Sequence, residues 1–158
     1  MDDRTVIVRT AGITVFVLST AVFLPADDPA RIYVYAQRNT AARSWLPVSC
    51  GTSVVAEIKQ GTFFALSLAP GRYALFVKNG VPLPVDVHSG EESFVRLDWQ
   101  YEIGQPPIPV LVKVGPAEAR GDMKFLSYVS ARRVHSSLVA KNDPRPPVEP
   151  RLRTRDER

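Results

Sequence analysis

The chain has 158 residues, of which 45% are hydrophobic and 23% charged, a composition typical of one globular domain with short extensions. Its 14 prolines and 9 glycines form no repeat, which excludes collagen-like and solenoid proteins, and a single cysteine excludes a small disulfide-held fold. The net charge of +4 belongs to the end of the chain, because residues 132–158 hold eight of the 20 Lys and Arg but only four of the 16 Asp and Glu. The balanced remainder argues against a basic, nucleic-acid-binding body.

An uncharged segment, residues 10–26, lies near the start of the chain. Its stretch 11–24 has about the length of the apolar part of a secretory signal peptide. Ser19 and Ala21 satisfy the small-x-small rule for cleavage, and Pro25-Ala26 offers a poorer second site. We therefore predict a signal peptide at residues 1–26 and a secreted or periplasmic protein. Two alternatives stay open: an uncleaved membrane anchor at residues 10–26, and buried strands at residues 6–8 and 13–18.

From residue 30 onward, short apolar runs alternate with polar residues at the period of a β-strand. Turn residues separate the runs, among them Gly61 in the 59–62 turn and the Pro70-Gly71 step. The predicted strands are residues 31–36, 54–58, 63–68, 72–78, 83–88, 93–99, 110–114 and 124–130, with a helical turn within 115–122. Seven or eight such strands predict an all-β fold, an antiparallel β-sandwich over residues 27–141. Residues 142–158, rich in proline and arginine, are predicted to be a disordered tail.

Five segments of the strand region carry a family resemblance. They are residues 30–35 (ARIYVY), 48–51 with 55–58 (VSCG and VAEI), 60–64 (QGTFF), 68–73 (LAPGRY) and 89–96 (SGEESFVR). In this order they resemble the bacterial family known as domain of unknown function 2846, over about residues 30–140. The Pro-Gly-basic-Tyr step is also similar to that of transthyretin-like and carboxypeptidase-regulatory-like sandwiches. The resemblance implies a small exported or envelope-attached β-sandwich, and it implies no catalytic or ligand residues.

Many members of that family are lipoproteins, and this chain departs from them. Lipid attachment needs a cysteine directly after the hydrophobic segment. The one cysteine, Cys50, lies beyond the first predicted strand. We therefore expect a protein without a lipid anchor.

Cys50, Asp86 and His88 are the only grouping that suggests nucleophilic catalysis. Asp86 and His88 lie two residues apart on a predicted strand, so a carboxylate and an imidazole share one face. No spacing brings Cys50 to His88, and free cysteines are among the most buried residues. We predict no catalytic residues, and a small hydrolase or thiol enzyme using these three side chains is the alternative.

Metal and carboxylate chemistry has weaker candidates still. They are His88, His135 and Cys50 for a transition metal, Asp86, Glu91 and Glu92 for calcium, and Asp98 with Glu102 for glycoside hydrolysis. The first set has no chelating spacing, the second lacks a calcium-loop signature, and a carboxylate pair like the third occurs in most β-proteins. No phosphate loop, dinucleotide fingerprint or Gly-x-Ser-x-Gly motif occurs. We predict neither a metal nor a cofactor.

Trp45, Trp99 and Tyr101 are the candidate ligand residues. Aromatic side chains at a sandwich edge can stack a sugar ring or receive a peptide, and the competing interpretation of Trp99 is burial in the core. We expect a non-enzymatic accessory or ligand-binding module of the cell envelope, with a structural or assembly role as a further alternative. Its partner is expected to be an envelope protein or a carbohydrate and not nucleic acid, with membrane contact only if the N-terminal segment is retained.

Overall fold

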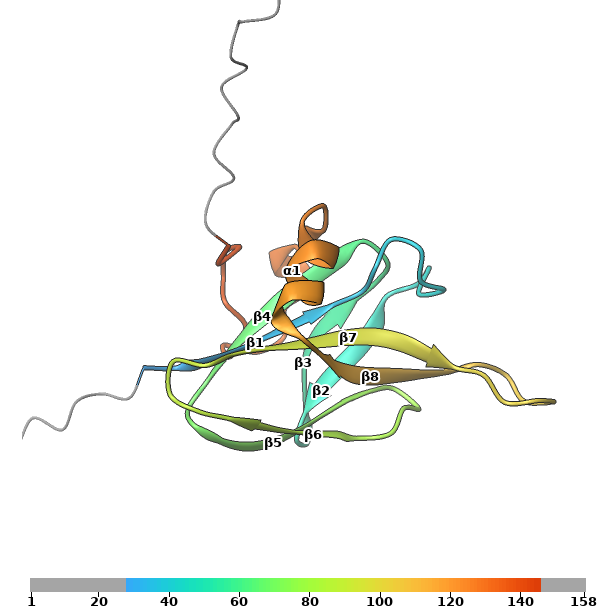
Figure 1. The fold of residues 1–158 in the computed structure, drawn as a ribbon, viewed down its shortest axis with the longest axis horizontal. Helices are drawn as coiled ribbons and strands as arrows, with labels where there is room; N and C mark the ends of the chain where they lie inside the picture. Colours follow the sequence, from blue (N-terminus) through green and yellow to red (C-terminus); the bar gives the residue numbers. More distant parts are fainter. Residues whose placement is uncertain (1–27, 146–158) are drawn as a thin grey trace, which may run out of the picture.

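A computed structural model describes residues 28–145 of the chain (Figure 1). The predicted leader, including both of its alternatives, and residues 146–158 of the predicted tail lie outside this range. Within it, the strands are β1 (Ala30–Tyr35), β2 (Leu46–Cys50), β3 (Ser53–Ile58), β4 (Thr62–Leu68), β5 (Gly71–Val77), β6 (Leu83–Val87), β7 (Glu92–Gln100), β8 (Ile108–Val114) and β9 (Ser127–Tyr128). One α-helix, α1 (Pro116–Met123), and a 3-10 turn (Ala131–Arg133) complete the described elements.

The strands form two sheets that pack face to face (Figure 1). The five-stranded sheet has the order β8-β7-β1-β4-β9, and the four-stranded sheet has the order β3-β2-β5-β6. Most neighbours are antiparallel, whereas β1 with β7 and β4 with β9 run parallel. The predicted all-β sandwich is confirmed. The two parallel pairs join strands that are far apart in the chain. The alternation of apolar and polar residues within one strand does not determine which other strand it pairs with.

The main apolar core lies between the two sheets, and the period-two pattern predicts which side chains fill it. Along β7, Val95 and Leu97 are buried in this core and Trp99 packs against it, as the alternation predicts. Leu75 and Val77 of β5 enter it from the other sheet. Truncating one such side chain to alanine costs about 2–5 kcal/mol in proteins generally, so this core is the main source of stability.

A second apolar cluster covers the other face of the five-stranded sheet. Tyr33 and Tyr35 of β1 and Phe94 of β7 pack there with Ala119 of α1, and the Tyr33 and Phe94 rings stack with their centroids 5.1 Å apart. The five-stranded sheet is therefore buried on both faces, which explains why β1 is almost continuously buried. It forms the middle layer, with α1 above it and the four-stranded sheet below it in Figure 1.

Helix α1 begins directly after β8. Gly115 precedes it in an extended conformation and Pro116 occupies its first turn, where a missing N–H costs nothing. Arg96 of β7 anchors the helix, with Nη1 2.6 Å from Glu118 Oε1 and 3.6 Å from Asp122 Oδ2. The predicted helical turn within 115–122 is thus an eight-residue helix. Within residues 28–145, no helix has the length and apolar character needed to cross a membrane.

Two strand predictions differ from the structure. The strand predicted at residues 124–130 is reduced to β9, because Leu126 still belongs to the turn that leaves α1 and donates its N–H to the Met123 carbonyl at 3.1 Å. Strand β2 was not among the predicted strands, because Pro47 breaks the usual strand composition. Its half-buried Leu46 and Cys50 and its buried Val48 nevertheless pack on the main core.

The packed body extends past the predicted boundary at residue 141. Val139 forms a bridge with Leu66 of β4, and the Ala140 N–H donates to the Ala65 carbonyl at 2.9 Å. Arg145 then donates to the Met123 and Leu126 carbonyls at 2.6 and 3.0 Å. Arg145, placed in the tail by composition, therefore contacts the body through its side chain, which a proline-rich sequence does not reveal.

Candidate functional site

Four connections meet at one end of the sandwich, called here the loop end. They are residues 36–45, 59–61, 78–82 and 101–107, on the right in Figure 1. The Gln60 N–H donates to the Ala42 carbonyl at 2.8 Å, which joins the first two connections. Trp99, at the base of the last connection, donates from Nε1 to Thr40 Oγ1 at 3.0 Å. Loops held at one end of a β-scaffold are a common place for binding residues.

Gly80 lets the 78–82 connection lie directly against β8. A Cβ added at this position would stand 2.5 Å from the Pro109 carbonyl oxygen and 2.8 Å from Val77 Cγ2. A backbone oxygen at that distance cannot yield without a shift of the loop or of the strand. The close approach fixes the position of Val81, whose side chain is 65% exposed.

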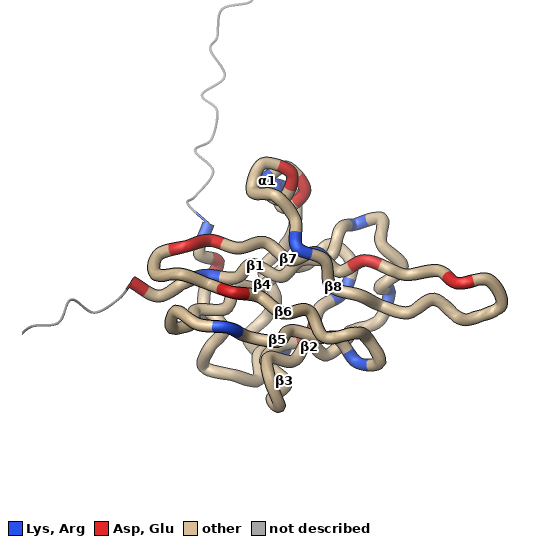
Figure 2. Tube along the Cα trace, turned by 60° about the horizontal axis from the view of Figure 1, so that its bottom comes forward, with Lys and Arg blue, Asp and Glu red and all other residues tan. Residues whose placement is uncertain are grey.

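The connection between β7 and β8 is a finger that projects beyond the other loops (Figures 1 and 2). A turn closes it, in which the Gln105 N–H donates to the Glu102 carbonyl at 3.2 Å and Gly104 takes a φ of +80°. Positive φ at the third turn residue is typical of a type II turn and favours glycine there. Ile103 at the tip is fully exposed, and Tyr101 is 71% exposed.

The structure brings Trp45, Trp99 and Tyr101 to the loop end but gives them different surroundings. Trp45 and Trp99 are half-buried and pack against the main core, whereas Tyr101 stands in solvent. The Trp45 ring lies under two cations, with Lys59 Nζ 4.8 Å and Arg133 Cζ 4.6 Å from its centroid. Only Tyr101 of the three presents a largely exposed ring.

A charged cluster that the sequence did not single out lies beside Trp45. Arg133 Nη1 donates to Glu57 Oε2 at 2.5 Å, and His135 Nε2 lies 3.3 Å from Glu57 Oε1. Partial desolvation alone would raise the pKa of Glu57, but the contacts with Arg133 and His135 hold it below the ordinary value. The cluster forms because Val134 makes a β-bridge with Ala56 of β3 and the 3-10 turn before it contacts the same strand. No local motif signals a contact between residues so distant in the chain.

The thiol grouping of Cys50, Asp86 and His88 is not assembled. Cys50 lies opposite Leu75, which pairs with Leu83, so His88 is five residues further along β6 and its continuation. At about 3.3 Å per residue, this offset is about 16 Å along the strands alone. Burial raises the pKa of the Cys50 thiol, the opposite of the change that activates a nucleophilic cysteine.

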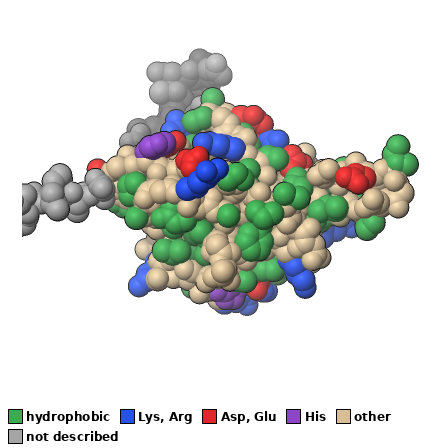
Figure 3. Space-filling model, turned by 90° about the horizontal axis from the view of Figure 1, so that it is seen from below, with side chains coloured by type: hydrophobic (Ala, Val, Ile, Leu, Met, Phe, Trp, Pro, Cys, Tyr) green, Lys and Arg blue, Asp and Glu red, His purple; other side chains and the backbone are tan. Residues whose placement is uncertain are grey.

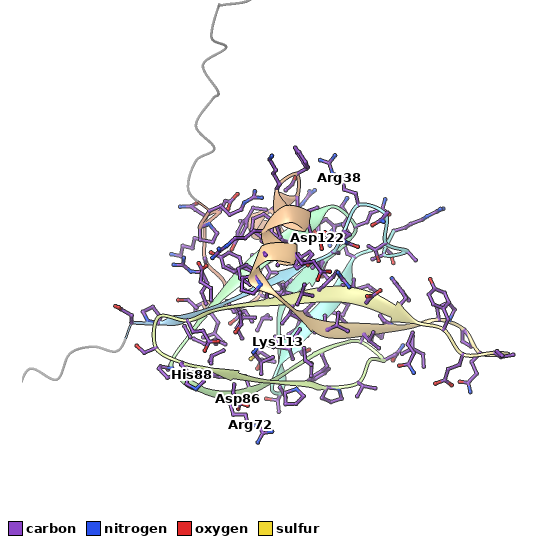
Figure 4. The ribbon with its side chains drawn as sticks, viewed as in Figure 1. Arg38, Arg72, Asp86, His88, Lys113 and Asp122 are labelled. Atoms are coloured by element: carbon purple, nitrogen blue, oxygen red, sulfur yellow. The ribbon has the colours of Figure 1, made fainter. Side chains whose placement is uncertain are left out.

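Asp86 and His88 each have a local partner instead. Asp86 Oδ1 lies 3.5 Å from Arg72 Nε across the β5–β6 pair, and His88 Nδ1 lies 2.6 Å from Glu91 Oε2. Figure 4 shows His88 at the end of the molecule opposite the finger. Both pairs are exposed to solvent, where such ion pairs contribute little to stability.

The remaining carboxylate candidates are also dispersed. Asp98 Oδ2 pairs with Arg96 at 3.3 Å, whereas Glu102 Oε1 accepts from Gln100 at 3.2 Å. Glu92 Oε2 pairs with Arg120 at 3.3 Å. Over residues 28–145, no three His, Cys, Asp or Glu side chains gather in a way that could hold a metal ion.

Comparison with known proteins gives one likeness in structure. No family model matches the chain, and no curated protein matches it either. A solved structure of the N-terminal domain of AlgF from P. aeruginosa is 22% identical in sequence and covers 58% of this chain and all of that domain, with a TM-score of 0.35. A likeness of this size carries no argument about what the chain does or where it acts.

Proposed function

We propose that this chain is an exported, non-enzymatic β-sandwich of the cell envelope that binds its partner through the loop end. The observation that carries the binding role is the projecting finger, which holds the exposed Tyr101 and Ile103 in water on a turn braced by Trp99. Exposed large apolar side chains gathered at one place are a usual mark of an interaction site. The export part is supported by the apolar segment at residues 10–26.

A binding role is favoured over the thiol enzyme by the strand register. Acyl or thiol chemistry needs a base within hydrogen-bonding reach of the nucleophile. Cys50 lies level with Leu75 and Leu83 in the four-stranded sheet, whereas His88 follows the far end of β6 and its ring faces Glu91. The loop end, in contrast, has its aromatic and apolar side chains on connections that lie side by side.

The export part is tested by the mass of the chain recovered from its native cells. Cleavage after Ala21 or Ala26 is the expected result, with the shortened protein in the envelope or secreted fraction. Recovery of the uncleaved chain from the cytosol would overturn this part.

The binding part is tested by site-specific photo-cross-linking in those cells. One variant carries a photoreactive amino acid in place of Ile103 at the finger tip, and the matched control carries it in place of Ser89, an exposed residue at the opposite end. We expect adducts at position 103 and none at position 89. Equal yields at the two positions, or none at either, would refute binding through the loop end.

A further inference from the structure

The exposed apolar side chains of the loop end lie on a convex surface. Ile103 lies at the tip of the finger, Tyr101 on its flank, and Val81 on the neighbouring loop. Figure 3 shows apolar side chains at the end of the finger as well as over the sheet beside it. A convex apolar tip fits either a rigid partner with a matching pocket or a fluid apolar phase that closes around it.

Cations stand behind this tip on the other connections. Arg43 and Lys78 are exposed and Lys59 is half-buried. Within residues 28–145, the ion pairs between arginines and carboxylates are made by other cations. The tip itself carries one carboxylate, Glu102, which is held by Gln100. The loop end therefore combines apolar side chains in front with positive charge behind, and within residues 28–145 no acidic side chain neutralises that charge in an ion pair.

The spacing of the two groups matches the depth of a membrane interface. Trp99 is tied to the 36–45 connection and Pro109 lies against Gly80, so these residues mark the level of the basic loops. Ile103 follows Trp99 by four residues, which places the tip up to about 13 Å further out. Apolar side chains of peripheral proteins enter about 5–10 Å into the boundary between headgroups and acyl chains. The cations then lie at the level of the headgroups.

We propose that the loop end docks on an anionic lipid surface, with Ile103 and Tyr101 inserted and Arg43, Lys59 and Lys78 facing the headgroups. The inference rests on the proposed function, because it names the partner of the same loop end. A lipid surface is favoured over a sugar, because the Trp45 ring that would stack a sugar already lies under Lys59 and Arg133. Tyrosine near the interface and basic residues near anionic lipid are the side chains that such surfaces select.

The test is flotation of the chain with vesicles of phosphatidylcholine, with and without phosphatidylglycerol. Ile103→Asp is compared with Val54→Asp, because Val54 is a 42% exposed apolar residue at the opposite end of the sandwich. The mature chain, beginning at residue 27 after the proposed cleavage, is used for all variants, because the apolar segment 10–26 would itself bind vesicles and mask the differences. We expect at least about a tenfold loss of binding to the anionic vesicles for Ile103→Asp and none for Val54→Asp.

A second pair of variants isolates the charge. Glu102→Gln removes the carboxylate from the tip and is expected to strengthen binding to anionic vesicles about fivefold. Asp28→Asn, an equal change at an exposed residue of the opposite end, is expected to leave it unchanged. Lys78→Gln is expected to weaken it about fivefold, and salt is expected to reduce these differences.

Three results would overturn the inference: equal losses in the two aspartate variants, equal binding with and without phosphatidylglycerol, or no difference between Glu102→Gln and Asp28→Asn. If position 103 cross-links to a protein while the finger variants bind vesicles as the unchanged chain does, the inference of a lipid surface is wrong and the proposed function stands. If neither cross-linking nor flotation depends on position 103, both fall. Unfolding curves of each variant show whether the fold is retained, and the mild Glu102→Gln change keeps the test valid if Ile103→Asp misfolds.

Discussion

Arg145 gives the sharpest test of where the folded body ends. Its guanidinium donates from Nη1 to the Met123 carbonyl at 2.6 Å and from Nη2 to the Leu126 carbonyl at 3.0 Å. Its Cζ also lies 4.1 Å from the centroid of the Phe63 ring. The last carbonyls of a helix have no partner within the helix. The Met123 carbonyl at the end of α1 accepts the Leu126 N–H at 3.1 Å, and Arg145 gives it a second donor. Deletion of residues 142–158 removes these contacts, whereas deletion of residues 146–158 leaves them.

The magnitude follows from the contacts. A hydrogen bond from a charged donor contributes about 1.5–3 kcal/mol. Because both bonds come from one side chain that is 29% exposed, we assign about 1.5–2 kcal/mol to the two together. The contact with the Phe63 ring adds about 0.5–1 kcal/mol. Arg145→Ala should therefore lower the free energy of unfolding by about 2–3 kcal/mol, which lowers the Tm of a body of this size by about 10 °C.

The assay is thermal and urea unfolding followed by circular dichroism. The chain ending at residue 145 should match the full chain, and the chain ending at residue 141 should fall together with Arg145→Ala. Arg145→Lys keeps the charge but not the planar fork, so its loss should be intermediate. Arg132→Ala, at an exposed arginine of the 3-10 turn, is the matched control and should change stability by less than about 0.5 kcal/mol. Equal midpoints for the chains ending at 141 and 145 would refute the reasoning.

Three further predictions concern single positions in the chain. In urea unfolding, Gly80→Ala should destabilise the protein by about 2 kcal/mol or more, because the added Cβ would meet the Pro109 oxygen. The control Gly121→Ala, which has open space in α1, should stabilise it by about 0.5–1 kcal/mol. An unchanged stability of Gly80→Ala would contradict the close approach. The pKa of Glu57 is lowered in the fold, so its contribution to stability is present above its ordinary value of 4.5 and is lost as the pH falls through the lowered value. Glu57→Gln should therefore flatten the pH dependence of unfolding below about pH 5, and parallel curves for the two proteins would disprove this. Burial raises the pKa of Cys50, so iodoacetamide should alkylate it at least about tenfold more slowly than free cysteine, and a matching rate would show an accessible thiol.

The loop end shows what sequence analysis can find of a binding surface. Trp45, Trp99 and Tyr101 could be selected in advance because aromatic side chains at strand ends and in polar loops are unusual. Their difference in exposure could not, because it depends on Thr40, Lys59 and Arg133, which reach them from other connections. Ile103 was not selected, since a single apolar residue in a turn is no signal until the turn is known to project.

Alternating apolar residues within 30–114 and the turns between them determined most strands and the sandwich class, because a strand's side-chain period is local. Strand β2 could not be predicted in this way, because Pro47 lies within it. The tertiary structure decided the parallel pairing of β1 with β7, the second core beneath α1 and the separation of Cys50 from His88. It also placed Arg145 in the body. Each of these features depends on contacts between residues far apart in the chain. Such contacts produce no periodic pattern of residues that could be recognised in the sequence.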